Sequence, residues 1–416
     1  MSTGSGSPSE GGDDRPKRFP LLEPLRAIAA ISILLVHVAI FAEAFDDALY
    51  GRLVAHLDIG VPFFFLLSAF LLYRPFLVAR VEAGRSRSLR TYARRRFWRI
   101  APAYWAALTI SAIVPGMAGA FSGNWWVYYG LLQDFPIYTP TGLCAIDGFR
   151  CALPTTWSLA VEVLFYLMLP LLVLATARLG KGFPKRHWLS IELGFVAVLT
   201  LISVAIQSSK IDTDVERWLF YSPLGRGWWF GLGLGLAALS VAAEQRADGK
   251  VSAWFRRNPG PPVALAAVLY VVACEWLLTP SPSLGFNIGT ETTSAYVGGY
   301  LLFGLIPALL MLPIAFTPDA REGFYRRILS HRWLAWLGSI SYGIFLWQIP
   351  VLIGLLDIHA ASALPIPVFP ALLVMTLAVT IACAALSFYL LERPLMRRFR
   401  GDRAVLDPND PAAVAP

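Results

Sequence analysis

The chain has 416 residues, of which 56% are hydrophobic and 15% are charged, and its formal net charge is +8. The charged fraction is well below the value of about 25% that an ordinary soluble domain carries. The mean hydropathy is +0.59, so the chain is apolar on average. The apolar residues come in runs of about 20, which are long enough to cross a bilayer as helices. These features exclude a soluble enzyme, a disordered chain, a disulfide scaffold and an alternating transmembrane β-barrel.

Ten apolar runs follow one another along the chain and predict an all-α, polytopic integral membrane protein. The transmembrane helices are expected over about 20–44, 59–79, 98–116, 156–178, 188–209, 219–243, 261–279, 295–316, 334–356 and 367–391. Residues 1–18 and 400–416 are polar and predict disordered cytosolic tails, which leaves 19–399 as the expected membrane domain. We expect the last tail to be too short for a further folded domain.

The loops between these runs carry their positive charge on one side. Counted by alternate sides, 29 of the 35 lysines and arginines fall on the side of the two termini, and four fall on the other. Cytoplasmic loops are enriched in Lys and Arg, so this count predicts an even number of spans with both termini in the cytosol. The membrane topology accounts for the positive net charge, so no nucleic-acid partner is needed to explain it. We expect a multi-pass protein of a bacterial plasma membrane.

The few cysteines and the lack of glycine-rich nucleotide motifs limit the cofactor chemistry that the sequence predicts. Cys144 and Cys151 lie seven residues apart in the expected outer loop before the fourth span, where a disulfide is permitted but not required. The sequence contains no Cys/His cluster with metal-ligand spacing and no Walker-type or Rossmann glycine motif. It therefore predicts neither a metal centre nor an ATP-driven engine.

The segment LRAIAAISILLVHV of the first expected span contains two ionisable residues, Arg26 and His37. An ionisable side chain within a span is costly and commonly functional. At 100° per residue, the eleven-residue spacing places both on one face of the helix, roughly 16 Å apart along its axis. The alternative is an arginine that extends to the interface and a histidine that packs in the core.

Glu162, near the outer end of the fourth expected span, lies at a depth similar to that of His37. A carboxylate that bonds an imidazole fixes its tautomer and raises its basicity, as a general base requires. We therefore expect a catalytic group of His37, Glu162 and Arg26. The alternative is that Glu162 pairs with Arg226, which lies in the outer half of its own span.

Several other side chains in or beside the spans are candidates for binding the substrate. Each also has a simpler interpretation as a packing residue or as a side chain bonded to its own backbone. The candidates are Ser68, Trp157, Arg226 and Tyr342, with Ser341 next to Tyr342.

A run of arginines lies in the segment SLRTYARRRFWRIAPAYW, on the expected cytosolic side. Guanidinium groups bind phosphate oxygens in bidentate fashion, so the run fits a nucleotide-bearing donor such as coenzyme A (CoA). The candidate donor-binding residues are Arg94, Arg95, Arg96, Arg99 and Tyr104. The alternative is a positive anchor that only sets the topology.

These motifs, in this order, resemble the membrane acyltransferase family 3, the O-acetyltransferases of bacterial envelopes and natural products. LRAIAAISILLVHV carries the Arg–ten residues–His signature at Arg26 and His37. The segments VPFFFLLSAFLL, RRRFWRIAPAY and WSLAVEVLFY look like further family motifs, and LGSISYGIFLWQ and LLERPLMRR resemble the last two helices. Two positions depart from the pattern: Ala69 stands where the family commonly has glycine, and Gln348 where it often has histidine.

The resemblance implies an acyl-CoA-dependent O-acyltransferase. Its donor would be acetyl-CoA or another acyl-CoA, and its acceptor a hydroxyl of a sugar, glycan, glycolipid or macrolide. The CoA nucleotide would lie at the arginines, with its pantetheine arm passing Arg26. His37 would deprotonate the acceptor for direct transfer, or carry the acyl group itself. The alternative function is a transporter that exports an acylated or amphipathic small molecule through the same buried charges.

Overall fold

The computed structural model describes residues 19–45, 49–81, 88–133, 135, 148–182, 184–209, 213–246, 249–276, 293–362 and 364–399. These residues form helices and no strand, apart from one isolated bridge between Ala118 and Cys151. A helix satisfies its own backbone hydrogen bonds where lipid offers none, which is why apolar runs fold this way. The expected tails 1–18 and 400–416 and Cys144 lie outside the described residues. Cys151 is disulfide-bonded, and Cys274 and Cys383 are free.

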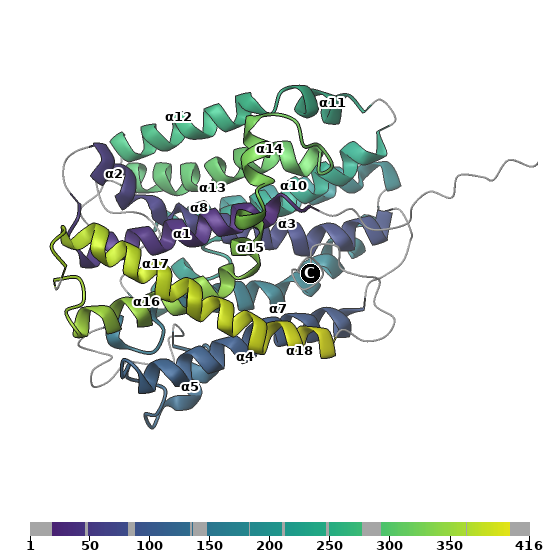
Figure 1. The fold of residues 1–416 in the computed structure, drawn as a ribbon. Coiled ribbons are helices and arrows are strands. Elements are labelled where there is room, and N and C mark those ends of the chain that lie inside the picture. The colour runs from purple at the N-terminus through teal and green to yellow at the C-terminus, as the bar shows by residue number, and fades with distance from the viewer. Residues whose placement is uncertain are drawn as a thin grey trace, which may run out of the picture.

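The long helices lie roughly side by side along one direction (Figure 1). They are α1 (Leu22–Phe41), α3 (Gly60–Val81), α4 (Leu89–Ile113), α7 (Trp157–Lys181), α8 (Trp188–Gln207), α10 (Gly227–Gln245), α12 (Gly260–Trp276), α13 (Thr293–Phe316), α16 (Ser341–Asp357) and α17 (Val368–Ser387). The short helices are α2 (Leu49–Ala55), α5 (Trp125–Tyr129), α9 (Asp214–Tyr221), α11 (Lys250–Arg257), α14 (Phe324–Leu329), α15 (Arg332–Ser339) and α18 (Arg393–Arg398).

Each of the ten expected ranges overlaps one of the long helices. Among the described residues, seven helical stretches are long and apolar enough to cross a membrane, and α15 with α16 makes an eighth if the bent pair is one span. The helix α12 is shorter, and α4 carries arginines along its first half. The helical, multi-pass architecture is therefore confirmed, whereas the number of ten and the cytosolic termini stay predictions.

Two of the expected spans are not continuous helices. The range 219–243 is divided because α9 ends at Tyr221 and α10 begins at Gly227, and the Ser222 side chain accepts the backbone N–H of Gly225 between them. The range 334–356 is divided at Ile340, where α15 and α16 meet at an angle of 69°. The first break contains Pro223, which has no backbone N–H to continue a helix. The second break, at Ile340, contains no proline, the most usual cause of a kink.

The helix α10 lies at the centre of the bundle and packs against α3, α8 and α13. Its contact with α3 is close, since a Cβ added at Gly233 would lie 2.7 Å from the Cβ of Ala69. Beside this contact the ring of Phe65 stacks on Phe230, and Phe230 stacks on Phe165, with centroids 4.7 and 4.1 Å apart. The helices α3, α7 and α10 thus form a firmly packed wall.

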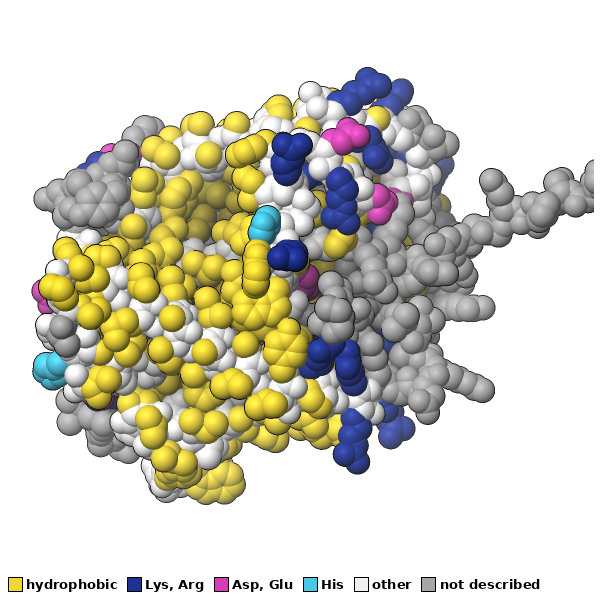
Figure 2. Space-filling model, viewed as in Figure 1, with side chains coloured by type: hydrophobic (Ala, Val, Ile, Leu, Met, Phe, Trp, Pro, Cys, Tyr) yellow, Lys and Arg dark blue, Asp and Glu magenta, His cyan; other side chains and the backbone are white. Residues whose placement is uncertain are grey.

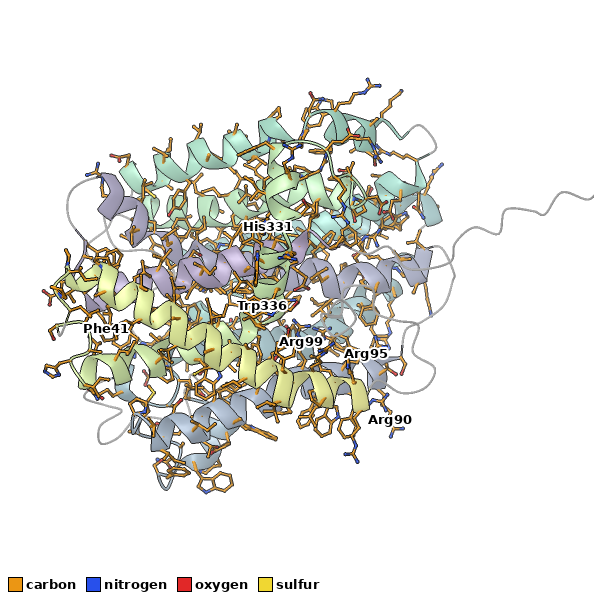
Figure 3. The ribbon with its side chains drawn as sticks, in the orientation of Figure 1. Phe41, Arg90, Arg95, Arg99, His331 and Trp336 are labelled. Atoms are coloured by element: carbon orange, nitrogen blue, oxygen red, sulfur yellow. The ribbon has the colours of Figure 1, made fainter. Side chains whose placement is uncertain are left out.

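The two ends of the bundle differ in charge. Lysine and arginine side chains gather at one end in Figure 2, which we call the basic end. The helix α4 carries Arg90 and Arg95 at this end, and Phe41 of α1 lies at the other, which we call the opposite end (Figure 3). Hydrophobic side chains cover the visible face between the two ends (Figure 2), as in a surface that faces lipid.

Candidate active site

A cavity of about 40 Å³, measured as the space open to the centre of a water-sized sphere, lies between α1, α3, α7 and α16 and opens to solvent. We call it the central cavity. Its walls are mostly apolar with a few polar groups that converge, the usual character of a small-molecule site. The lining residues are Arg26, Ile33, Val61, Phe64, Phe65, Ser158, Leu159, Glu162, Ser341, Tyr342 and Phe345.

Arg26 reaches the central cavity from the second turn of α1. Its side chain is 14% exposed, and its Nη1 lies 3.7 Å from Oε1 of Glu23. Arg99 and Glu162 both lie within electrostatic reach of the guanidinium. The Nε of Arg26 has no hydrogen-bond partner in the part of the chain that the structure describes. The cavity therefore contains a largely buried cation with an unused donor.

Glu162 faces the central cavity from α7 and is held there by two hydroxyl groups. The Ser68 hydroxyl on α3 donates to Oε1 of Glu162. The Tyr166 hydroxyl, one turn further along α7, donates to the same oxygen at 2.5 Å. Since α3 packs against both α1 and α7, Ser68 lies where it can fix the carboxylate. The position of Glu162 is thus set by two neutral donors.

His37 is buried on α1, with only 6% of its surface exposed. Its Nδ1 lies 3.3 Å from Oε1 of Gln348 on α16, and Nε2 of Gln348 donates to the Phe345 carbonyl at 3.2 Å. An amide oxygen only accepts, so Nδ1 of His37 carries the proton in this bond. The neutral ring then keeps the lone pair of Nε2, which is the group that a general base needs.

His37 and Gln348 lie one helical turn beyond the wall of the central cavity. Ile33 and Phe345 line the cavity, and they precede His37 by four residues and Gln348 by three. The cavity therefore leads along α1 from Arg26 towards His37. The common face that the sequence predicted for Arg26 and His37 fits this course.

The expected contact between Glu162 and His37 is replaced by other hydrogen bonds, as is the alternative pair of Glu162 with Arg226. Similar depth in the membrane indicates that two side chains can meet, but it does not give the rotation of each helix about its axis. Here α3 supplies Ser68 to the carboxylate, and α16 supplies Gln348 to the imidazole.

The arginines of the expected donor site lie along α4. Arg90, Arg95 and Arg99 follow this helix from the basic end towards the middle of the bundle (Figure 3). Arg94 is exposed, whereas Arg95 and Arg99 are half-buried. Within the described ranges, the Nε of Arg95 has no hydrogen-bond partner. The structure therefore separates Arg94, which faces solvent, from the arginines nearer the bundle.

Arg96 is linked to the central cavity through Tyr166. Its guanidinium carbon lies 5.9 Å from the centre of the Tyr166 ring, and the Tyr166 hydroxyl binds Glu162. One turn earlier on α4, the Tyr92 hydroxyl donates to the Tyr166 carbonyl at 3.0 Å. These contacts tie the arginine-bearing face of α4 to the cavity wall.

The two tyrosines predicted from the sequence have different surroundings. Tyr104 is buried, and its hydroxyl donates to the Tyr128 carbonyl at 2.5 Å, so it ties α4 to α5. Tyr342 lines the central cavity, and its hydroxyl donates to the Ile100 carbonyl of α4 at 3.0 Å. Only Tyr342 thus borders the space that a ligand would occupy.

Arg226 is fully buried at the start of α10. Four aromatic rings enclose its guanidinium carbon at 4.8–5.8 Å from their centres: Trp157, Phe220, Tyr221 and Trp229. Among the described residues, none accepts a hydrogen bond from its three side-chain nitrogens. Cation–π attraction therefore stabilises this charge. The structure brings Trp157 and Arg226 together, as one group apart from the cavity lining.

Tyr166 and Gln348 complete the site but were not among the predicted site residues. Tyr166 had a local signal, because it follows Glu162 by four residues and shares its helix face. Gln348 had none, since its partner lies 311 residues away in the chain. Within the described ranges, no group of three or more His, Cys, Asp or Glu side chains is placed to hold a metal ion.

Comparison with known proteins places this chain in a family. The family model described as "Acyltransferase domain" matches residues 22–385. The peptidoglycan O-acetyltransferase OatA of Listeria monocytogenes is 26% identical over 403 residues, covering 92% of this chain and 56% of the relative. The putative peptidoglycan O-acetyltransferase YrhL of Bacillus subtilis is 25% identical over 394 residues, covering 91% and 55%. The O-acetyltransferase OatA of Staphylococcus aureus is 23% identical over 400 residues, covering 92% and 58%.

The chain thus spans little more than half the length of these curated relatives, and no solved structure matches it. The family match nevertheless covers almost the whole of the helical bundle, including both ends of the central cavity. This chain is therefore a multi-pass membrane protein that belongs to the acyltransferase-domain family, the family that its motifs indicated.

Proposed function

We propose that the protein is a membrane O-acyltransferase that moves an acetyl group from acetyl-CoA to a hydroxyl group of a glycan. The observation that carries the proposal is the course of the central cavity, from Arg26 to within one turn of an imidazole whose Nδ1–H is held by Gln348. Membership of the acyltransferase family supports the reaction class. The names of the relatives, which refer to peptidoglycan, support a cell-envelope glycan as the acceptor.

The donor enters from the basic end in this proposal. Positively charged loops favour the cytosolic side, where acetyl-CoA is available. Arg95, Arg96 and Arg99 would bind the nucleotide, because guanidinium groups match phosphate oxygens. Arg94 would act from the exposed face, and Tyr104 would support the helix from behind. The pantetheine arm would pass Arg26 and bring the thioester to His37, roughly 16 Å further along α1.

The chemistry needs one base and one leaving group. Nε2 of His37 takes the proton of the acceptor hydroxyl, and the oxygen attacks the thioester carbon. The new C–O bond forms as the C–S bond breaks, and the departing sulfur receives the proton from His37. In the two-step route, Nε2 itself attacks the thioester carbon, the C–S bond breaks, and CoA departs as the thiolate. The acceptor oxygen then attacks the acyl-imidazole carbon, the C–N bond breaks, and the hydroxyl proton goes to the CoA thiolate.

The remaining polar residues position the reactants. Glu162, fixed by Ser68, supplies the negative charge that balances Arg26 across the cavity. Tyr342 borders the path of the donor. Trp157 is half-buried, and its ring packs against the guanidinium of Arg226, which is enclosed by aromatic rings. We assign this pair to binding of the acceptor.

Release of free CoA thiol tests the proposal. The purified protein in nanodiscs is incubated with acetyl-CoA and a panel of acceptors that includes soluble peptidoglycan fragments, simple sugars and a non-carbohydrate alcohol. We expect thiol release that depends on the glycan acceptor. Binding of acetyl-CoA without thiol release for any acceptor would contradict transfer. Absence of both binding and release would favour the transporter alternative.

A further inference from the structure

The helix α16 begins inside the central cavity. The bend at Ile340 directs α15 away, and Ile340 offers no side-chain cap to the new helix. The first backbone hydrogen bond of α16 runs from Ile344 N to Ile340 O at 3.0 Å, so the N–H groups of Ser341 and Tyr342 precede it. Both residues line the cavity. The positive end of a 17-residue helix therefore borders this space.

Ser341 adds a side-chain donor at the same point. It is only 1% exposed, and it faces the central cavity. Within the part of the chain that the structure describes, its hydroxyl makes no hydrogen bond. Buried polar groups are normally bonded, and Nε of Arg26 in the same cavity also has no such partner there. Two buried donors are thus available to a ligand that enters.

The charges around this point favour an anion. Arg26 and Arg99 lie near each other. Of the carboxylates within reach of Arg26, Glu23 is 3.7 Å from its guanidinium, and Glu162 already accepts two hydroxyl hydrogen bonds. The start of a helix carries about half a positive charge, and its free N–H groups bind phosphate oxygens well.

The position of the site along α1 decides which part of a donor it holds. The reacting carbonyl must lie beside His37, and Arg26 is roughly 16 Å away along the helix axis. An anion at Arg26 and Ser341 therefore belongs to a part of the donor distant from the thioester. In acyl-CoA, the pantetheine arm separates the thioester from a diphosphate. The apolar wall formed by Ile33, Phe64 and Phe345 suits such an arm.

We propose that the start of α16, with the Ser341 hydroxyl and Arg26, binds the diphosphate of the acyl-CoA donor. The identity of the donor rests on the proposed function, whereas the chemistry of the site is that of a diphosphate held by backbone N–H groups, a hydroxyl and a guanidinium. The α4 arginines then hold the remainder of the nucleotide, nearer the basic end.

Binding measurements on three serine variants test this proposal. Ser341→Asp places a negative charge at the first position of α16, where an acidic residue suits the helix, and pantetheine binding reports whether the cavity stays intact. Ser341→Thr keeps the hydroxyl. Ser362→Asp is the matched control, because Ser362 is exposed beyond the far end of α16. Calorimetry in nanodiscs measures binding of CoA, of inorganic diphosphate and of pantetheine, which lacks phosphate.

We expect Ser341→Asp to weaken binding of CoA and diphosphate about tenfold or more, the scale of a lost charge-assisted contact. Pantetheine binding by Ser341→Asp stays at the wild-type value. Ser341→Thr, which keeps the hydroxyl, binds CoA and diphosphate more tightly than Ser341→Asp, and Ser362→Asp binds all three probes as wild type does. Equal CoA affinity in Ser341→Asp and wild type would overturn the proposal. So would an equal loss of pantetheine binding, which indicates general damage to the cavity.

The outcomes separate this site from the proposed function. If the wild type releases thiol but Ser341→Asp binds CoA normally, the site is wrong and the function stands. If Ser341→Asp loses diphosphate binding but the wild type transfers no acetyl group to any acceptor, the site stands and the function is wrong. A wild-type protein that binds neither CoA nor diphosphate overturns the site.

Discussion

The imidazole of His37 is held by the side-chain amide of Gln348, with Nδ1 3.3 Å from Oε1, across the contact between α1 and α16. A carboxylate in this place would add charge stabilisation to the protonated ring. The amide supplies orientation alone, since it fixes the tautomer and carries no charge. The geometry therefore gives Gln348 a positioning role for His37.

Substitution of Gln348 tests this relationship. In Gln348→Ala the imidazole of His37 loses the side-chain oxygen that accepts from its Nδ1. We expect kcat to fall about tenfold to hundredfold, which is part of what a well-placed base contributes. The KM for acetyl-CoA should stay unchanged. Gln348→His restores a side chain that can accept from Nδ1, and we expect it to recover most of the rate. Steady-state kinetics distinguish the two variants. Wild-type kcat in Gln348→Ala would show that the amide has no positioning role.

The hydroxyl groups around Glu162 are tested by Tyr166→Phe and Ser68→Ala. Each change removes one hydrogen bond to a carboxylate, an interaction worth about 1.5–3 kcal/mol, and frees the carboxylate to move within the cavity. We expect both variants to lose activity, and the double variant to lose more. Tyr325→Phe is the control, because the Tyr325 hydroxyl donates to the Leu310 carbonyl away from the cavity. Equal activity of Tyr166→Phe and Tyr325→Phe would contradict the role assigned to Tyr166.

The junction of α15 with α1 leaves no room for a methyl group at Gly338. An added Cβ would lie 2.1 Å from the Glu23 carbonyl oxygen, one turn before Arg26. We expect Gly338→Ala to destabilise the protein by about 1–3 kcal/mol and to lower activity by displacing the start of α1. Thermal unfolding in detergent measures the first effect. Gly180→Ala is the control, since no atom lies within 4 Å of a Cβ there, and a similar Tm for both variants would refute the close contact.

The ring enclosure of Arg226 gives a prediction that separates stability from binding. A buried charge without an opposite charge is costly, so we expect Arg226→Met to fold at least as stably as the wild type. The substitution also removes the group on which Trp157 lies, and we expect the KM for the glycan acceptor to rise while that for acetyl-CoA stays constant. A lower Tm with unchanged KM values would instead make the enclosure purely structural.

The sequence predicted the helical class and the approximate place of every long helix, because apolar runs of this length have one stable form in lipid. It also predicted that Arg26 and His37 share a face, since helical periodicity is local. It did not predict the bend at Ile340. The bend lies beside a non-local contact, since Gly338 closely approaches the backbone of α1, and no pattern around residue 340 reveals this contact.

The partners of the buried polar residues were the least predictable part. The approximate depth of Glu162 and of His37 in the membrane follows from their positions along the apolar runs. The identity of each hydrogen-bond partner depends instead on how four helices are rotated against one another. Ser68 and Gln348 reach these residues from α3 and α16. Tyr166 alone had a local signal, as the residue one turn after Glu162.

The central claim is that His37 performs the transfer. Acceptor-dependent release of CoA thiol is therefore measured for wild type and His37→Ala in nanodiscs, with acetyl-CoA binding as the check that the variant is folded. We expect His37→Ala to bind acetyl-CoA as wild type does and to lose about 100-fold or more in rate, the contribution of a general base. Turnover by His37→Ala within about twofold of wild type would contradict this claim.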